Sequence, residues 1–246
     1  MENFFVLENQ LPAGAGFATF GREHICWLLI AAALGAALCM AFRRAGRRGQ
    51  ARLRVAVGCM ILLCELLKDA NLLAQGVFDI YYLPLHLCGI AVFFSFYHSL
   101  RPGEVIGNFL YSTCMPGAFC ALLFPDWTAY PAFSYHSIVA FLVHTLLTVY
   151  PLMLLCGGAF RPNRRRLPAC FIILLSLAVP IYVFDRIFQA NYMFLLQPSP
   201  GSPLEWFASF LGNPGYLLGY LPMLAVIWAA LYFPFRHRER DSSMDV

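Results

Sequence analysis

The sequence predicts an all-α, polytopic membrane helical bundle of about seven transmembrane helices, with its N-terminus outside and its C-terminus in the cytoplasm. The first observation is composition: 60% of the 246 residues are hydrophobic and 12% are charged, far outside the range of soluble globular domains. Several apolar stretches also reach the roughly 20 residues that a helix needs to cross about 30 Å of hydrocarbon. The third observation is that basic residues cluster in alternate loops.

The helices are expected where apolar runs lie between charged or proline-rich breaks. Arginines follow the first, third, fifth and seventh runs, whereas the fourth and sixth lead into aromatic, basic-free loops, "FPDWTAYPAF" and "NYMFLLQPSPGSPLEW". The predicted spans cover residues 22–42, 53–75, 80–100, 105–124, 131–156, 167–190 and 213–235. They form one transmembrane domain at 21–236, after a short exposed extracytoplasmic tail at 1–20 and before a cytoplasmic tail at 237–246.

The basic residues set the orientation. With seven spans, the loops and tail that carry them all lie on one side, which the positive-inside rule assigns to the cytoplasm. The net charge of +4 is therefore a topology signal of a multi-pass protein in the cytoplasmic membrane, and it does not indicate nucleic-acid binding. The residues concerned are Arg43, Arg44, Arg47, Arg48, Arg52, Arg54, Arg101, Arg161, Arg164, Arg165, Arg166, Arg236, Arg238 and Arg240.

Charged residues also fall inside the second predicted span, "CMILLCELLKDANLLAQG". Glu65, Lys68 and Asp69 are spaced i, i+3 and i+4, so they share one helix face, and Asn71 extends the polar surface towards the outer end. An ionisable side chain near the bilayer centre costs about 2.5 to 3.5 kcal/mol on insertion scales. Such a face is expected to lie towards the bundle interior or a wet cavity.

A second polar group, Asp185 and Arg186, lies at the outer end of the sixth span. Lys68 and Asp69 lie about 10 Å below the outer surface by the helical rise, so the two groups overlap in depth. Two interpretations stay open. The charges either form buried ion pairs that hold the bundle together, or they line a polar cavity that opens to the outer leaflet.

The third span contains "YYLPLHLCGIAVFF", in which His86 and Cys88 are two residues apart. On an ideal helix that spacing points the two side chains about 200° apart, so they would not act on the same atom. Pro84 marks a start or a kink, and Gly89 permits another backbone or a ligand to approach the cysteine side. Cys88 is expected about 10 Å deep, at the level of Lys68.

The fifth span carries His136 and His144, eight residues apart and therefore on broadly the same side of the helix. A cysteine with a histidine base is a nucleophilic pair, because the thiolate is the reactive form. In a membrane its natural substrate is a lipid acyl ester or thioester, and the reaction passes through an acyl-cysteine. The rival hypothesis, from a different functional class, is an ion- or proton-coupled carrier or sensor that uses the intramembrane charges.

No cofactor or metal site is expected. The nine cysteines fall in or beside apolar segments without a CxxC spacing, and the sequence contains neither HExxH nor GxSxG. The expected partner is a membrane lipid substrate.

Blocks along nearly the whole chain resemble the YwaF-type bacterial membrane proteins, namely "CELLKDANLL", "LPLHLC", "FPDWTAYPAF", "AFLVHTLLTVYPL" and "GNPGYLLGYLPML". These are similar to the eukaryotic transmembrane protein 164, an acyltransferase described as using a Cys and His pair on ether phospholipids. The resemblance implies that Cys88 is the nucleophile and that its histidine is His144, with His136 as the alternative. This chain departs from the family in carrying Gly89 directly after the cysteine, where a polar residue is common.

Overall fold

The computed structural model describes residues 4–7, 10–12, 14–199 and 201–235. The predicted tail at 237–246, together with Arg236, lies outside these residues. The described chain is helical and contains no strand, which confirms the all-α prediction. Its α-helices are α1 (Arg22–Arg44), α2 (Arg47–Ala74), α3 (Leu87–Leu100), α4 (Glu104–Phe109), α5 (Met115–Leu123), α6 (Tyr135–Cys156), α7 (Leu167–Phe188), α8 (Pro203–Leu211) and α9 (Tyr220–Tyr232).

Five helical segments of the described chain are long and apolar enough to cross a membrane: Arg22–Arg44, Glu104–Leu123, Tyr135–Cys156, Arg164–Phe188 and Gly215–Phe235. The protein is therefore a multi-pass membrane protein. Each of these five segments coincides with a predicted span. The other two predicted spans correspond to α2, which is 28 residues long but carries several charges, and to α3, which is apolar but has only 14 residues. The count of seven crossings stays a prediction.

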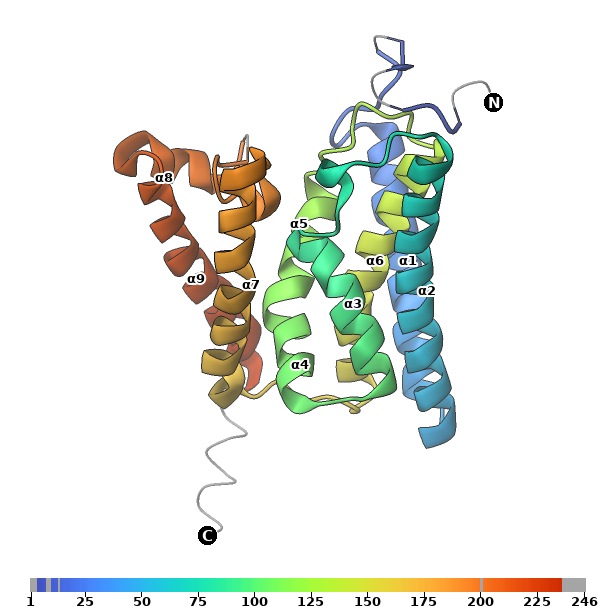
Figure 1. Ribbon diagram of the computed structural model, residues 1–246. Helices are drawn as coiled ribbons and strands as arrows, with labels where there is room; N and C mark the ends of the chain where they lie inside the picture. Colours follow the sequence, from blue (N-terminus) through green and yellow to red (C-terminus); the bar gives the residue numbers. More distant parts are fainter. Residues whose placement is uncertain (1–3, 8–9, 13, 200, 236–246) are drawn as a thin grey trace.

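The helices run roughly side by side (Figure 1). Helix α6 is central, since it packs against α1, α2, α3 and α5. Helix α7 packs against α4, and α8 and α9 lie beyond α7 (Figure 1). The main hydrophobic core lies between these helices, with Phe42, Ile61, Phe109 and Tyr150 among its fully enclosed side chains.

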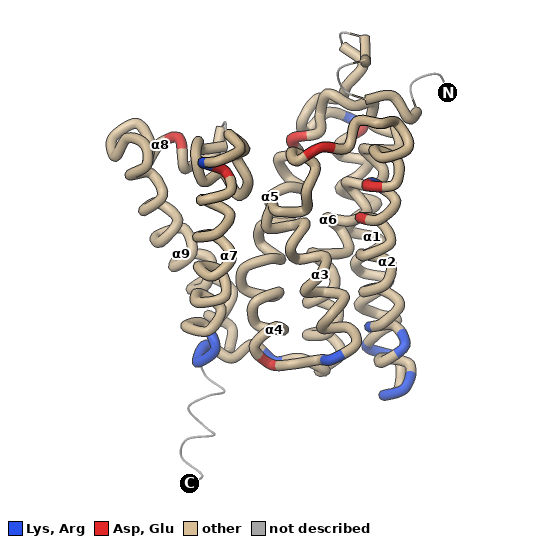
Figure 2. Tube along the Cα trace, in the orientation of Figure 1, with Lys and Arg blue, Asp and Glu red and all other residues tan. Residues whose placement is uncertain are grey.

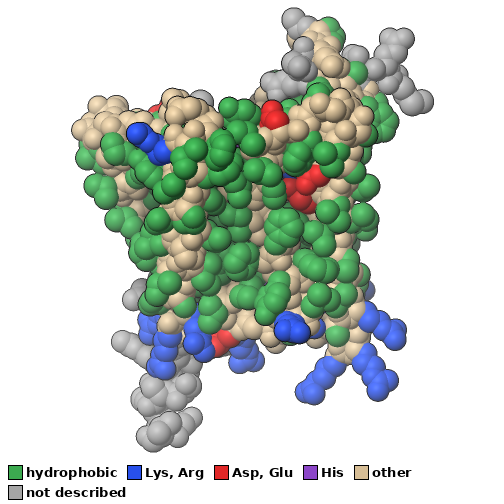
Figure 3. Space-filling model, in the orientation of Figure 1, with side chains coloured by type: hydrophobic (Ala, Val, Ile, Leu, Met, Phe, Trp, Pro, Cys, Tyr) green, Lys and Arg blue, Asp and Glu red, His purple; other side chains and the backbone are tan. Residues whose placement is uncertain are grey.

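Arginine residues gather at the end of the bundle where α1 ends and α2 begins (Figure 2). Hydrophobic side chains cover most of the face above that end (Figure 3). Because the arginine-bearing loops meet at one end, the arrangement agrees with the alternation expected from the sequence. The assignment of that end to the cytoplasm stays a prediction.

Several helix boundaries differ from those predicted, and one short helix was not predicted. Helix α2 begins at Arg47 instead of residue 53. Helix α3 begins at Leu87 instead of residue 80, because Ile80–Tyr82 forms a separate 3-10 turn capped by Asp79, and His86 has extended backbone angles. Helix α8 was missed: the "SPLEW" stretch was assigned to a loop, whereas Pro203 starts a short helix there.

The segment between α4 and α5, Leu110–Cys114, is π-helical and fully buried. Two hydrogen bonds join it to α9. The Trp228 indole N–H donates to the Ser112 carbonyl at 3.2 Å, and the Tyr111 hydroxyl donates to the Leu231 carbonyl at 3.1 Å. A wide turn of this kind is rare inside an α-helix, and here it faces a neighbouring helix.

The described part of the 1–20 segment is not a free exposed tail. Leu7 and Phe17 are buried, and the Phe17 N–H donates to the Thr128 carbonyl at 3.0 Å. Gly16 is required at this contact, because a Cβ there would overlap the Thr128 carbonyl oxygen. The segment therefore closes over the loop between α5 and α6 at the end opposite the arginines (Figure 1).

Candidate functional site

Cys88 is the second residue of α3, and His86 is the residue that precedes the first turn. The cysteine is therefore not two turns down a helix that starts near Tyr81, as the predicted boundary implied. It lies in the first turn, where backbone N–H groups are free and the helix dipole favours negative charge. Its side chain is partly buried and packs against the main hydrophobic core. The thiol is therefore partly shielded by the protein but remains accessible to a substrate.

Gly89 allows the backbone of Pro84 to lie against the first turn of α3. A Cβ at this position would lie 2.8 Å from both the Cα and the carbonyl oxygen of Pro84, which is closer than real Cβ contacts. The prediction that Gly89 permits close backbone approach beside Cys88 is therefore confirmed, and the approaching backbone is that of Pro84. The tight fold of residues 84–86 back onto the first turn positions the cysteine.

His86 contacts the turn that follows α7. The Met193 N–H donates to its Nδ1 at 3.3 Å, and its ring lies 5.0 Å from that of Tyr192 and 5.6 Å from that of Phe194. The helical-wheel argument for separating His86 from Cys88 does not apply, because His86 is not helical. Their contacts nevertheless differ, since Cys88 packs against the main hydrophobic core whereas His86 contacts the turn that follows α7, although Asp126 acts electrostatically on both.

His144 is held in a defined orientation on α6. Its Nδ1 lies 2.8 Å from the Ala140 carbonyl oxygen, and because a carbonyl only accepts, Nδ1 carries the proton. In the neutral ring Nε2 therefore keeps a free lone pair. The Trp127 ring stacks on the imidazole, with centroids 4.9 Å apart and planes inclined by 22°. The ring is thus oriented from two sides and can accept a proton at Nε2.

His136 lies two turns nearer the start of α6. Its ring contacts those of Tyr130 at 4.9 Å and Tyr135 at 5.5 Å. Its Nε2 is buried, with no hydrogen-bond partner among the described residues. His136 lacks the backbone bond and the stacked indole that orient His144.

Two charged groups connect these side chains. Asp126, in the loop between α5 and α6, lies within electrostatic range of Cys88, His86 and His144. Lys68, on α2, lies within range of both α6 histidines and of His86. Charges on α2 and in the α5–α6 loop therefore act on residues of both α3 and α6, towards the end of the bundle opposite the arginines.

The charges of α2 pair with one another. Lys68 Nζ lies 2.6 Å from Glu65 Oε1 and 3.3 Å from Asp69 Oδ1, and Glu65 is buried. The shared face expected from their spacing is present. Asn71 continues it by accepting a hydrogen bond from Gln75 at 2.7 Å. One lysine between two carboxylates gives the group a net negative charge when all three are ionised.

The structure does not bring Asp185 and Arg186 into this group. Asp185 is fully buried on α7, where its Oδ1 accepts the Tyr192 N–H at 3.0 Å and its Oδ2 has no recorded partner, while Arg186 is exposed. Across the described chain neither residue forms an ion pair. Burial raises the pKa of Tyr192 to about 12, so its hydroxyl keeps the proton that it donates to the Ile80 carbonyl at 2.6 Å.

Sequence reasoning missed Asp126 and Trp127 as candidate site residues. Both lie in "FPDWTAYPAF", which was interpreted only as an interfacial loop and as part of the family resemblance. The available signal was the acidic residue beside a tryptophan in a loop without basic residues. Trp127 is 8% exposed, and its indole N–H has no partner within the described chain.

The model of the TMEM164 family matches residues 19–232, which include every helix described above. No curated protein and no solved structure matches the chain. Within the described residues, no group of three or more His, Cys, Asp or Glu side chains is placed to hold a metal ion.

Proposed function

This chain belongs to the TMEM164 family, and on that premise we propose that it is a membrane-embedded lipid acyltransferase or lipid hydrolase that works through an acyl-cysteine at Cys88. Family membership is consistent with an acyltransferase. The observation that carries the proposal is the preparation of His144, whose Nδ1–H is bound by the Ala140 carbonyl so that Nε2 is left to act as a base.

The reaction has two halves. Cys88 Sγ attacks the acyl carbonyl while its proton passes to His144 Nε2, and collapse of the tetrahedral intermediate returns that proton to the leaving lipid alkoxide. An acceptor hydroxyl, or water, then gives its proton to Nε2 and attacks the thioester, which restores the thiol. In this arrangement the Ala140 carbonyl orients the imidazole, which is the part that a carboxylate plays in many triads.

Asp126 supports the choice of His144 over His136 as the base. It acts electrostatically on His144, and its charge stabilises the imidazolium that forms when this ring takes up the proton of the thiol. His136 is assigned to the wall of the substrate site, where its unpartnered Nε2 can bind a polar group of the lipid.

The remaining polar residues are assigned to substrate binding. Glu65, Lys68, Asp69 and Asn71 form a polar face of α2 that suits the polar part of a lipid, and Glu65 acts electrostatically on Cys88. His86, ahead of α3, is assigned to the same substrate site. Asp185 and Arg186 form a separate polar group on α7, in which Asp185 is buried and the exposed Arg186 is the residue assigned to a headgroup contact.

The proposal includes a topology. Seven crossings result when α2 and α3 are added to the five long apolar helices, and the arginine-rich end (Figure 2) then faces the cytoplasm. The N-terminus and the site lie on the opposite side of a cytoplasmic membrane. The bacterial YwaF-type membership that the sequence suggests is part of the same proposal.

Cysteine substitution tests the mechanism. The full-length protein is reconstituted in phospholipid vesicles with an isotope-labelled acyl chain, and acyl exchange and thioester formation are followed by mass spectrometry. Cys88→Ala is expected to abolish both, while the matched substitution Cys59→Ala, at an exposed cysteine of α2, leaves both intact. His144→Ala is expected to slow both halves of the reaction far more than His136→Ala.

The rival carrier hypothesis predicts a different result. A carrier would keep its transport function in Cys88→Ala and lose it in Asp69→Asn, with no acyl-cysteine in either protein. Retention of acyl exchange by a folded Cys88→Ala protein contradicts nucleophilic catalysis by this residue.

A further inference from the structure

A pair of cysteines lies at the arginine-rich end of the bundle, away from the proposed site. Cys39 is on α1, and Cys156 is the last residue of α6. The two thiols are neighbours across the contact between α1 and α6. Cys39 is half-buried and Cys156 is exposed, so a reagent can reach the pair through Cys156.

The two helices are fixed on both sides of this pair. Further from the arginine-rich end than the two cysteines, Gly35 of α1 faces Val149 of α6. A Cβ on this glycine would lie 2.9 Å from the valine methyl group. Next to the pair, Gly157 lies against the Phe42 ring, where an added Cβ would come within 2.3 Å of a ring carbon. Both glycines therefore bring the helix backbones close together.

A side chain from α2 closes the arrangement. Gln50 Nε2 donates to the Phe42 carbonyl at 3.1 Å and to the Gly157 carbonyl at 3.3 Å. One amide thus bridges the end of α6 and the last turns of α1. Since Phe42 lies one turn from Cys39 and Gly157 directly follows Cys156, the backbone packing itself brings the two cysteines close together.

We propose that Cys39 and Cys156 are a redox modification site, at which a hydroperoxide converts the two thiols into an intramolecular disulfide. The exposed Cys156 sulfur, as thiolate, attacks the terminal peroxide oxygen, which breaks the O–O bond and gives a sulfenic acid and an alcohol. The Cys39 sulfur then attacks the sulfenic sulfur and releases water. Two thiols lose two electrons, the hydroperoxide gains them, and an external dithiol reverses the change.

Hydroperoxides are the appropriate oxidant class because of where the pair lies. Cys156 is exposed at the end of an apolar span, a position that both peroxidised acyl chains and aqueous peroxide reach. The bond would join α1 covalently to α6, the helix that carries His136 and His144. The site is independent of the proposed lipid chemistry, since neither cysteine belongs to the group around Cys88.

Peptide mapping tests this inference on the full-length protein in phospholipid vesicles. The protein is treated with cumene hydroperoxide or hydrogen peroxide, alkylated, digested without reductant and analysed by mass spectrometry. A Cys39–Cys156 cross-link within one chain is expected, with its loss after dithiothreitol. In Cys39→Ser, a sulfenic acid at Cys156 is expected to accumulate and to be trapped by dimedone, while Cys26→Ser, a matched change at an exposed cysteine of α1, leaves the cross-link unchanged.

Two results would overturn the inference. One is oxidation of Cys26 to a sulfenic acid at a peroxide dose that produces no Cys39–Cys156 bond. The other is oxidation of Cys156 at the same rate in wild type and Cys39→Ser with only single-cysteine products. Both results are measured on the wild-type protein or on Cys39→Ser, which only replaces a thiol by a hydroxyl. Neither measurement depends on acyl transfer, so a negative result for the disulfide is distinct from a negative result for the proposed enzyme.

Discussion

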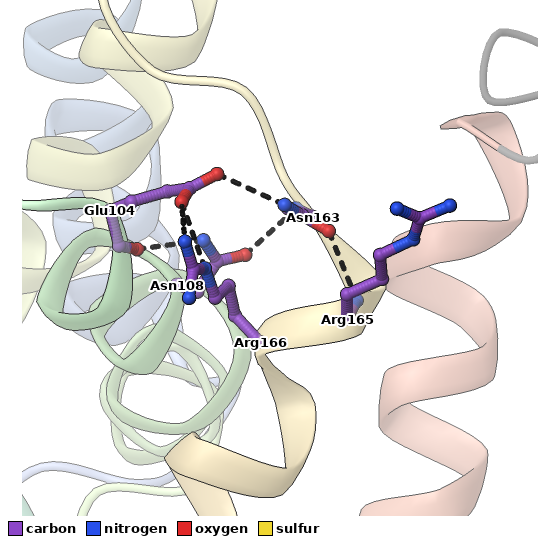
Figure 4. Close-up of polar contacts among 5 residues, drawn as sticks. All are labelled: Glu104, Asn108, Asn163, Arg165 and Arg166. Carbon is purple, nitrogen blue, oxygen red and sulfur yellow. Dashed lines mark hydrogen bonds and ion pairs between the residues drawn. The ribbon is translucent and has the colours of Figure 1, made fainter. Parts of the chain in front are cut away.

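Replacement of Asn108 is expected to be the most destabilising single change at the arginine-rich end of the bundle. The side chain is fully buried, and its Oδ1 accepts hydrogen bonds from the Asn163 N–H at 2.9 Å and the Tyr232 hydroxyl at 2.8 Å. Its Nδ2 donates to the Glu104 carbonyl at 2.7 Å. One side-chain amide therefore links three parts of the chain, namely α4, the segment that precedes α7, and α9. Figure 4 shows the contacts within α4 and with the segment that precedes α7.

The expected cost follows from the groups left without partners. Asn108→Ala removes the acceptor for a buried hydroxyl and a backbone N–H, and each orphaned donor costs about 1 to 3 kcal/mol. Asn163 is half-buried and regains part of its bond from water, so we expect a total of about 2 to 4 kcal/mol. Asn108→Asp, which keeps both acceptors, is expected to cost less when the introduced acid is protonated.

A neighbouring substitution supplies the control. Glu104 accepts from Arg166 Nε at 2.8 Å and from Asn163 Nδ2 at 3.0 Å (Figure 4), but its side chain is 46% exposed. Exposed ion pairs contribute about 0 to 1 kcal/mol, so Glu104→Gln is expected to have little effect. Thermal unfolding in detergent, followed by intrinsic fluorescence and by circular dichroism, measures both. Equal destabilisation by the two changes would refute the argument from burial.

Three further predictions concern the proposed site. Gly89→Ala places a methyl group against the Pro84 backbone. Labelling of Cys88 by an acyl probe is therefore expected to fall at least tenfold, while the helical content is retained. Unchanged labelling would show that the close approach of Pro84 to Gly89 does not position the cysteine. Lys68→Met leaves the buried carboxylate of Glu65 without its cation, which is expected to lower the free energy of unfolding by about 3 to 5 kcal/mol. A second change, Glu65→Gln, should recover most of this loss. No recovery in thermal unfolding would contradict the pairing of the two residues. Trp127→Phe should keep the stacked ring and most of the activity, whereas Trp127→Leu should lower kcat with little change in KM; equal losses would assign the indole N–H, and not the stack, to catalysis.

The sequence predicted the features of the fold that depend on local pattern. Apolar runs place the membrane helices because burial in hydrocarbon acts on each run separately, and the i, i+3, i+4 spacing placed Glu65, Lys68 and Asp69 on one face. The start of α3 was misplaced, because "YYLPLHLCGIAVFF" is apolar throughout and only the contact between Pro84 and Gly89 shows where the helix begins.

Contacts between distant segments account for the rest. Helical spacing brought His136 and His144 to one side of α6, but it could not show that Trp127 stacks on one of them and that the Ala140 carbonyl fixes its tautomer. The expected proximity of Asp185 to Lys68 rested on depth alone. Depth does not specify position around the bundle, and in the structure Asp185 bonds to the turn that follows its own helix.

The π-helical turn at Leu110–Cys114 adds a constraint on how this chain tolerates insertions and deletions. A regular α-helix turns by about 100° per residue, so a wide turn displaces every later side chain around the axis relative to the earlier ones. The wide turn uses about one residue more than an α-helical turn, so winding the same residues as a regular α-helix would rotate α5 by about 100° against α4. Asn108 and Cys120 could then no longer both face their present neighbours, and the Ser112 carbonyl would lose the Trp228 indole. A deletion of one residue would instead keep α4 and α5 nearly in phase, so the wide turn is the device that fits one additional residue between two ends of one helix that serve different surroundings.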